Sequence, residues 1–166
     1  MTELPPLTNR ANARVVDALT AAGAHDAAAG ARRLDESTHT AAAAAAVLGV
    51  PVGAIVKSLV FTADGEPLLV LASGDHLVDT GKVAAALGVA EVRRADPETV
   101  RAASGFAIGG VAPVGHPAPL RTVVDEHLST YPRLWAAAGT PDSIFPTDYD
   151  ELLRITAGVA LDVAAT

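Results

Sequence analysis

The sequence predicts an α/β fold in which helices surround one mixed β-sheet. Hydrophobic residues make up 50% of the 166 residues and aromatic residues only 4%, so the core must consist of Ala, Val and Leu side chains. Short apolar runs typical of strands are mixed with capped helical segments, without the regular alternation of a doubly wound fold. The length suits one domain over residues 1–166, with a helix within 1–25 ahead of the main body at 30–164.

Two apolar runs in the middle of the chain give the clearest pattern. Residues 55–61 and 68–72 flank Asp64 and Gly65, a dipeptide that strongly favours a tight hairpin turn. Both runs are continuously apolar rather than alternating, which is typical of strands covered on both faces. We therefore expect this hairpin in the middle of the sheet.

The other elements follow from shorter signals along the chain. Short strands are expected at residues 31–36, at the sheet edge, and at 91–94, 121–125, 134–138, 143–145 and 159–163. Helices are expected at 8–22, 37–49, 79–87, 96–105 and 148–156. Their expected caps are, in the same order, Thr8 or Asn9, Thr38 or Thr40, Asp79 with Thr80, Asp96, and Thr147.

Composition and charge argue against several classes of function. There is no cysteine, which excludes disulfides, thiolate metal sites and a cysteine nucleophile. The net charge of −7 argues against broad nucleic-acid binding, DNA included, although a local basic patch is compatible with it. The N-terminal residues do not resemble a signal peptide, and no run suits a bilayer span, so we expect a soluble cytoplasmic protein.

Few residues carry catalytic or metal-binding chemistry. The five histidines show no HxxxH or HxH spacing, and no nucleophile elbow, phosphate loop or dinucleotide fingerprint occurs. We therefore expect no metal and no cofactor. Lys57 stands in an apolar strand, where its ammonium either extends past the sheet end or points into a cleft and binds a phosphate or carbonyl oxygen.

The segment 109–116, GGVAPVGH, has almost no side chains to pack. Its glycines allow backbone N–H groups to approach a ligand and its prolines fix the chain, so it can grip a small carbonyl compound. It can equally be a plain surface loop. The segment alone does not decide between the two interpretations.

Six stretches carry a resemblance to a known family. They are AAAAAAVLGVPVGAIVKSLVF, LLVLASGDHLVDTGKVAAALG, GGVAPVGH, TVVDEHL, WAAAG and ELLRITAG, in consistent order within residues 30–164. Together they resemble the YbaK/EbsC family of editing domains associated with prolyl-tRNA synthetase. The resemblance implies that family's mixed α/β fold, and a free-standing or synthetase-fused deacylase that hydrolyses mischarged tRNA.

The resemblance also implies the site. Lys57 matches the family's lysine, Gly109 to Pro113 (GGVAP) its GxxxP loop, Asp125 its aspartate and Gly139 the glycine that closes the next strand. Thr40 falls where a related branch carries a tyrosine, which leaves the edited amino acid open. The expected catalytic residues are Lys57, Gly109, Gly110 and Asp125, and the expected substrate-binding residues are Thr40, Ser73, Val111, Ala112, Pro113, Gly115, His116, Gly139 and Thr140.

By the same resemblance, Lys57 holds a phosphate or the ester carbonyl, the GGVAP backbone grips the aminoacyl group, and water or a group within the substrate attacks. Asp125 is expected to orient Lys57 or the α-amine, or else to cap the turn at 125–126. His116 is expected to contact the substrate or to cap its loop. A side chain at Gly110 should then impair hydrolysis more than folding.

The expected function is trans-editing of mischarged tRNA, with tRNA-Pro carrying Cys or Ala as the first candidate. Prolyl-tRNA synthetase is an expected partner, and the chain is expected to be a monomer or homodimer with no membrane partner. One alternative is a non-catalytic module that binds tRNA or a synthetase. Its tRNA contacts would include Arg32, Arg33, Arg93 and Arg94. Another alternative is a hydrolase of free aminoacyl or peptidyl esters.

Overall fold

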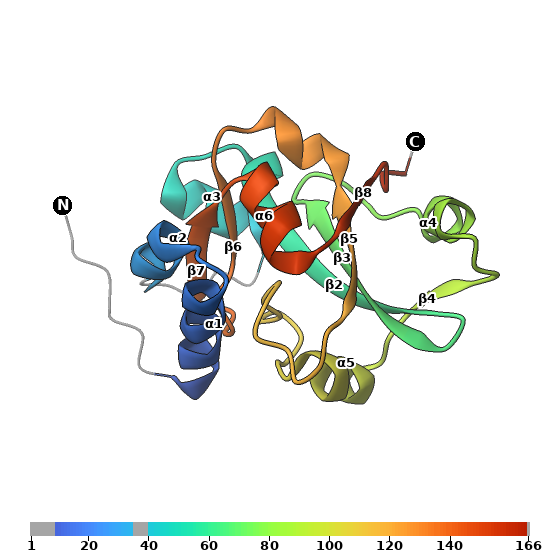
Figure 1. Cartoon of the computed structure of the whole chain (residues 1–166). Helices are drawn as coiled ribbons and strands as arrows, with labels where there is room; N and C mark the ends of the chain where they lie inside the picture. Colours follow the sequence, from blue (N-terminus) through green and yellow to red (C-terminus); the bar gives the residue numbers. More distant parts are fainter. Residues whose placement is uncertain (1–8, 35–39, 166) are drawn as a thin grey trace.

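A mixed β-sheet forms the centre of the computed structural model. Within residues 9–34 and 40–165, which the structure describes, this sheet has eight strands (Figure 1). The strands are β1 (Arg32–Arg33), β2 (Ile55–Ala63), β3 (Glu66–Ser73), β4 (Val92–Arg94), β5 (Arg121–Asp125), β6 (Leu134–Ala137), β7 (Ser143–Thr147) and β8 (Val159–Leu161). Their order is β1-β7-β6-β2-β3-β5-β8, with β4 paired to β2. The predicted mixed α/β class is confirmed.

The predicted central hairpin is formed by β2 and β3. The two strands pair antiparallel from Val56 opposite Ser73 to Ala63 opposite Glu66. The turn residues Asp64 and Gly65 both have positive φ, 49° and 85°, as a type I′ turn requires. Parallel pairs join β2 to β6, β3 to β5 and β5 to β8, which makes the sheet mixed.

Most helices begin and end where the caps predict. The helices are α1 (Arg10–Ala21), α2 (His25–Gly30), α3 (Ala41–Leu48), α4 (Thr80–Leu87), α5 (Pro97–Ser104) and α6 (Tyr149–Thr156), with short 3-10 turns η1 (Val52–Ala54) and η2 (Glu126–Thr130). The side chains of Asn9, Thr40, Asp79 and Asp96 accept the expected capping bonds. The alternative caps Thr8 and Thr38 lie outside the described residues, as do residues 35 and 36 of the predicted edge strand.

Two helix predictions are corrected. The cap of α6 is Asp148, whose carboxylate accepts from the Glu151 N–H at 2.8 Å. Thr147, the predicted cap, belongs to β7 and donates its hydroxyl to the Glu151 carboxylate at 2.7 Å. Helix α2 was not expected because its HDAAAG sequence has no apolar period, yet Ala27 packs it into the core.

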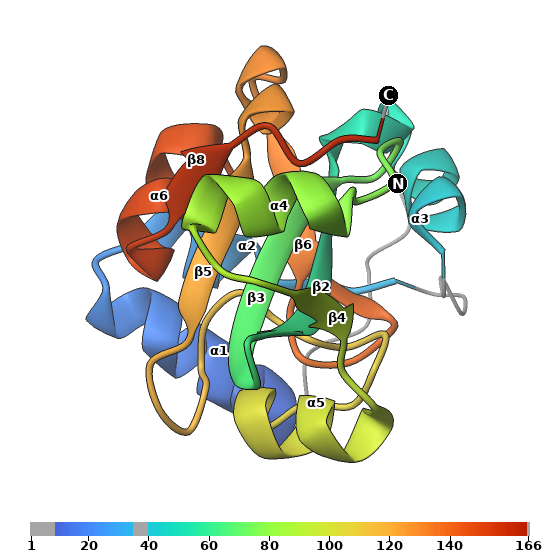
Figure 2. The same ribbon diagram turned by 90° about the vertical axis from the view of Figure 1, so that its right-hand side faces the viewer.

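Helices cover both faces of the sheet (Figures 1 and 2). Side chains of α1, α2, α5 and α6 share one core with the inward residues of β2, β3 and β5. Helix α4 packs on the opposite face over β3 and β5, and α3 packs beside β7. Among the helices in the described ranges, none has the length and apolar character needed to cross a bilayer.

The edge of β2 that faces β4 and β6 is open in its middle. The parallel ladder with β6 ends at Val56 opposite Ala136, and the antiparallel ladder with β4 begins at Phe61 opposite Arg94. Between them, the Val60 carbonyl accepts from the Ala95 N–H at 3.2 Å. Strand β2 thus has a short stretch without a strand partner on this edge, and the candidate site lies there.

Candidate functional site

A cavity of about 510 Å³ lies at this open edge of β2. Its walls come from α3, η1, β2, β4, α5, the segment after α5, β6 and β7. The lining residues are Thr40, Ala41, Ala42, Ala44, Val52, Ile55, Val56, Lys57, Ser58, Leu59, Val60, Gly74, Arg94, Ala95, Val100, Ile108, Gly109, Val111, Trp135, Ala136, Ala137, Pro141, Ser143 and Ile144. Among these described residues the charged ones, Lys57 and Arg94, are both cations. An apolar cavity with cationic groups and no carboxylate in its wall suits a ligand that is part apolar and part anionic.

Lys57 is half-buried on β2 and points toward the turn that follows β3. Its ammonium donates a hydrogen bond to the backbone carbonyl of His76. Burial lowers the pKa of Lys57 below its ordinary value of 10.5, and the carboxylates of Asp75 and Asp125 oppose that shift. Strand β2 therefore presents a partly desolvated ammonium beside the cavity that Lys57 lines. This position differs from that of a lysine whose ammonium simply extends past the end of the sheet into water.

The GGVAP loop meets the cavity through two of its residues. Gly109 and Val111 line it, and Ile108 just before them is 57% exposed. Gly109 has φ +92°, a conformation that disfavours any side chain. The loop follows α5, which ends at Ser104, and residues 106–120 form no strand.

Gly110 fills a packing position rather than an open one. A Cβ placed on it would lie 2.8 Å from the carbonyl oxygen of Gly139 and 2.9 Å from the Cα of Thr140. Gly139 in turn approaches the backbone of Ala11 in α1. The packing therefore predicts that a side chain at Gly110 lowers stability, so the expectation that hydrolysis would suffer more than folding does not follow from this geometry.

Thr140 and His116 have partners within the protein. The Thr140 hydroxyl donates to Asp142 at 2.8 Å and lies 2.6 Å from the Ser143 hydroxyl. The His116 Nε2 lies 2.7 Å from the Ala112 carbonyl oxygen, and burial lowers the pKa of His116 below 6.5. Of the two roles expected for His116, its contacts match the loop cap.

Asp125 is almost fully buried, with 1% of its surface exposed. Its carboxylate accepts from the N–H of Ser73 at 3.0 Å and of His127 at 3.0 Å, and lies 2.8 Å from Nδ1 of His76. Of the alternatives expected for Asp125, the capping role at η2 is present in these contacts. Asp125 thus links Ser73, at the end of β3, to His76, whose backbone carbonyl accepts a hydrogen bond from the Lys57 ammonium.

Two buried polar atoms in the cavity wall have no hydrogen-bond partner among the described residues. They are the hydroxyl oxygen of Ser58 and the indole Nε1 of Trp135. The guanidinium of Arg32 stacks over the Trp135 ring at 5.1 Å. A buried donor without a partner costs free energy, so both atoms are available to a polar ligand. Sequence reasoning missed both residues because strand residues of these types usually serve packing alone.

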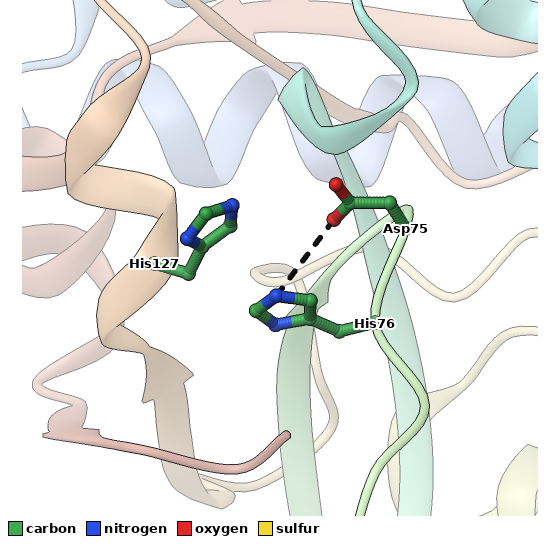
Figure 3. Close-up of side chains that lie close together, drawn as sticks. All are labelled: Asp75, His76 and His127. Atoms are coloured by element: carbon green, nitrogen blue, oxygen red, sulfur yellow. Dashed lines mark ion pairs between the residues drawn. The ribbon is translucent and has the colours of Figure 1, made fainter. Parts of the chain in front are cut away.

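A second group of side chains lies beside the cavity rather than in its wall. Asp75 and His76 follow β3, and His127 belongs to η2 after β5 (Figure 3). One potential ligand atom from each lies within 4.8 Å of the other two. The Ser73 hydroxyl donates to Asp75 at 2.8 Å and lowers the pKa of that carboxyl. Spacing rules missed this group because its members meet only through the pairing of β3 with β5.

The structure thus divides the predicted site residues into separate sets. Thr40, Lys57, Gly109 and Val111 line the cavity. The remaining residues are outside its lining. Gly110, Gly139 and Thr140 pack against one another, and Ala112 and Pro113 are buried in the loop. Gly115 and His116 lie toward α1 and Phe106, and the N–H of Ser73 donates to Asp125.

Comparison with known proteins agrees with this fold. The family model described as the aminoacyl-tRNA editing domain matches residues 35–155. The chain therefore belongs to the aminoacyl-tRNA editing domain family, and the predicted family resemblance is confirmed. A solved structure of a candidate trans-editing enzyme for prolyl-tRNA synthetase has a TM-score of 0.90 and 41% identity, and the match covers 96% of this chain and 100% of that one.

Two curated relatives are proline–tRNA ligases. The ligase of Nitratidesulfovibrio vulgaris is 39% identical over 90 residues, which are 54% of this chain and 16% of the ligase. That of a Geobacter species is 35% identical over 99 residues, 60% of this chain and 17% of the ligase. The matched segment thus spans about a sixth of the length of these ligases.

Proposed function

We propose that this chain is a trans-editing deacylase that hydrolyses the ester of mischarged tRNA, with tRNA-Pro carrying Ala or Cys as the first candidate. The observation that carries this proposal is the cavity at the open edge of β2, which combines apolar walls with Lys57 and Arg94. The apolar part suits a small aminoacyl side chain, and the cations suit the phosphate of the terminal nucleotide. Prolyl-tRNA synthetase is the proposed partner.

In the proposed reaction a water molecule adds to the ester carbonyl carbon, which becomes the carboxylate of the released amino acid. The bond from that carbon to the ribose oxygen breaks, and a proton ends on the ribose oxygen. Lys57 binds the phosphate or the developing oxyanion, and the backbone at Gly109 and Val111 borders the aminoacyl group. Positioning of the ester and the attacking group supplies much of the increase in deacylation rate, because aminoacyl esters are already labile.

The net charge of −7 means that tRNA must be held by local cations. Of the four arginines expected for this role, Arg33 pairs with Asp142 at 3.1 Å and Arg93 with Glu91 at 3.3 Å. Arg94 lines the cavity, and Arg32 stacks on a residue that lines it. We therefore assign the phosphate contacts to Arg32 and Arg94.

The test is deacylation of a panel of Ala-, Cys-, Ser- and Pro-tRNA by the purified protein. We expect turnover of at least one non-cognate species. Binding of mischarged tRNA without turnover would support the non-catalytic module instead. Turnover of a minimal aminoacyl-adenosine as fast as of whole tRNA would support the hydrolase of free esters.

A further inference from the structure

We propose that Asp75, His76 and His127 form a binding site for one divalent transition-metal ion of the zinc class. One carboxylate and two imidazoles are a common ligand set for such ions. The three ligand atoms lie within 4.8 Å of one another, and the side chains come together from the turn after β3 and from η2 (Figure 3). This site is separate from the proposed editing cavity, whose wall includes none of the three.

The contact between Asp125 and His76 is the strongest support for the site. Metal-binding histidines usually donate the proton of their second ring nitrogen to a carboxylate or a carbonyl. Here the buried carboxylate of Asp125 lies 2.8 Å from Nδ1 of His76, which places the proton of a neutral imidazole on Nδ1. Nε2 then keeps its lone pair, and it lies 3.9 Å from the carboxylate oxygen of Asp75.

The second imidazole is held close to the first by its own neighbours. The rings of His76 and His127 have centroids 4.4 Å apart with planes tilted by 33°, and the Tyr131 ring meets His127 edge-on at 5.6 Å. Two ligand atoms of a tetrahedral zinc ion lie about 3.3 Å apart, given bonds of about 2.0–2.1 Å. The group reaches that spacing by small rotations, which are open to Asp75 because its side chain is 40% exposed.

The hydrogen bonds around the group orient its ligand atoms. Lys57 donates to the backbone carbonyl of His76 and not to either imidazole. The Ser73 hydroxyl donates to Oδ1 of Asp75, the oxygen that lies 3.9 Å from Nε2 of His76, and a second lone pair on that oxygen is left for an ion. The Tyr131 hydroxyl lies 3.5 Å from Nε2 of His127. Since protein ligands supply three positions, a fourth position on the ion is left for water or another small ligand.

The test is titration of chelator-treated protein with Co²⁺, followed by its visible ligand-field absorption, and with Zn²⁺ in competition. The variants are His127→Ala and, as the matched control, His25→Ala, which removes an exposed histidine of α2 outside the group. We expect one ion per chain in the wild type and in His25→Ala, and affinity lowered at least about tenfold in His127→Ala. Asp125→Asn should weaken binding by about 10–100-fold through loss of the carboxylate that orients His76.

Circular dichroism of each apo variant shows whether it is folded, so loss of binding is separated from loss of structure. The ion should raise the melting temperature of the wild type and of His25→Ala more than that of His127→Ala. Equal Co²⁺ affinity in wild type and His127→Ala would overturn the proposal, as would absence of binding to the wild type at millimolar Co²⁺ and Zn²⁺.

Discussion

Replacing Asp125 with Asn should destabilise the protein strongly, although the two side chains have the same shape. One carboxylate oxygen of Asp125 accepts from the Ser73 N–H and lies against the His76 ring, and the other accepts from the His127 N–H. An asparagine keeps one oxygen and turns an NH₂ group toward the remaining donor. At least one buried donor therefore loses its acceptor, and the other bonds lose their charge.

The expected loss is about 2–4 kcal/mol of unfolding free energy. A hydrogen bond to a charged group contributes about 1.5–3 kcal/mol, and a buried donor without a partner adds a desolvation penalty. No discount for solvent screening applies, because Asp125 is 1% exposed. For a domain of this size the loss lowers the melting temperature on the order of 10 °C.

The assay is urea unfolding followed by circular dichroism, with Glu91→Gln as the control. Glu91 undergoes the same carboxylate-to-amide change in an ion pair with Arg93 in which both side chains are more than half exposed, so we expect a loss below about 1 kcal/mol. A loss below about 0.5 kcal/mol in Asp125→Asn would refute the idea that this carboxylate holds together the turns beside Lys57.

Two further predictions concern the loop and the lysine. Gly110→Ala should lower the free energy of unfolding by about 1–3 kcal/mol, because its Cβ would meet the Gly139 and Thr140 backbone. The control Gly81→Ala, at an exposed position of α4, should be neutral or stabilising in the same urea assay. Equal effects of the two substitutions would contradict the packing argument. Burial lowers the pKa of Lys57, so the enzyme-dependent deacylation rate, corrected for spontaneous hydrolysis, should fall as pH rises at values below 10.5, where an ordinary lysine is still protonated. Because the folded state binds the Lys57 proton less tightly than the unfolded chain, the contribution of Lys57 to the free energy of unfolding rises over the same pH range. A deacylation rate that stays constant up to pH 10.5 would show that the Lys57 ammonium is not needed.

Local signals predicted the fold well where they act alone. The Asp64 and Gly65 turn, the caps Asn9, Thr40, Asp79 and Asp96, and the continuously apolar runs each mark one element through residues that are neighbours along the chain. Helix α2 was missed because tertiary packing of Ala27 stabilises it. The start of α6 was placed one residue too early because Asp148, and not Thr147, accepts the capping hydrogen bond.

The candidate site was harder to predict because it depends on which strands are neighbours. The family resemblance pointed to Lys57 and the GGVAP loop, but it could not separate residues that line the cavity from those that pack behind it. Trp135 reaches the cavity only because β6 pairs with β2, and His127 meets His76 only because β5 pairs with β3. No spacing along the chain carries that information.

The central claim is that Lys57 takes part in deacylation in the cavity at the edge of β2, where it binds the phosphate or the developing oxyanion of the substrate. The chain has one other lysine, Lys82, which pairs with Asp162 at 3.1 Å and lies outside the cavity lining, so Lys82→Ala is a matched control for Lys57→Ala. The measurement is the single-turnover deacylation rate of the best non-cognate aminoacyl-tRNA by the two variants. We predict that Lys57→Ala is slower by at least about a hundredfold and that Lys82→Ala matches the wild type. Equal rates for Lys57→Ala and the wild type would contradict the claim.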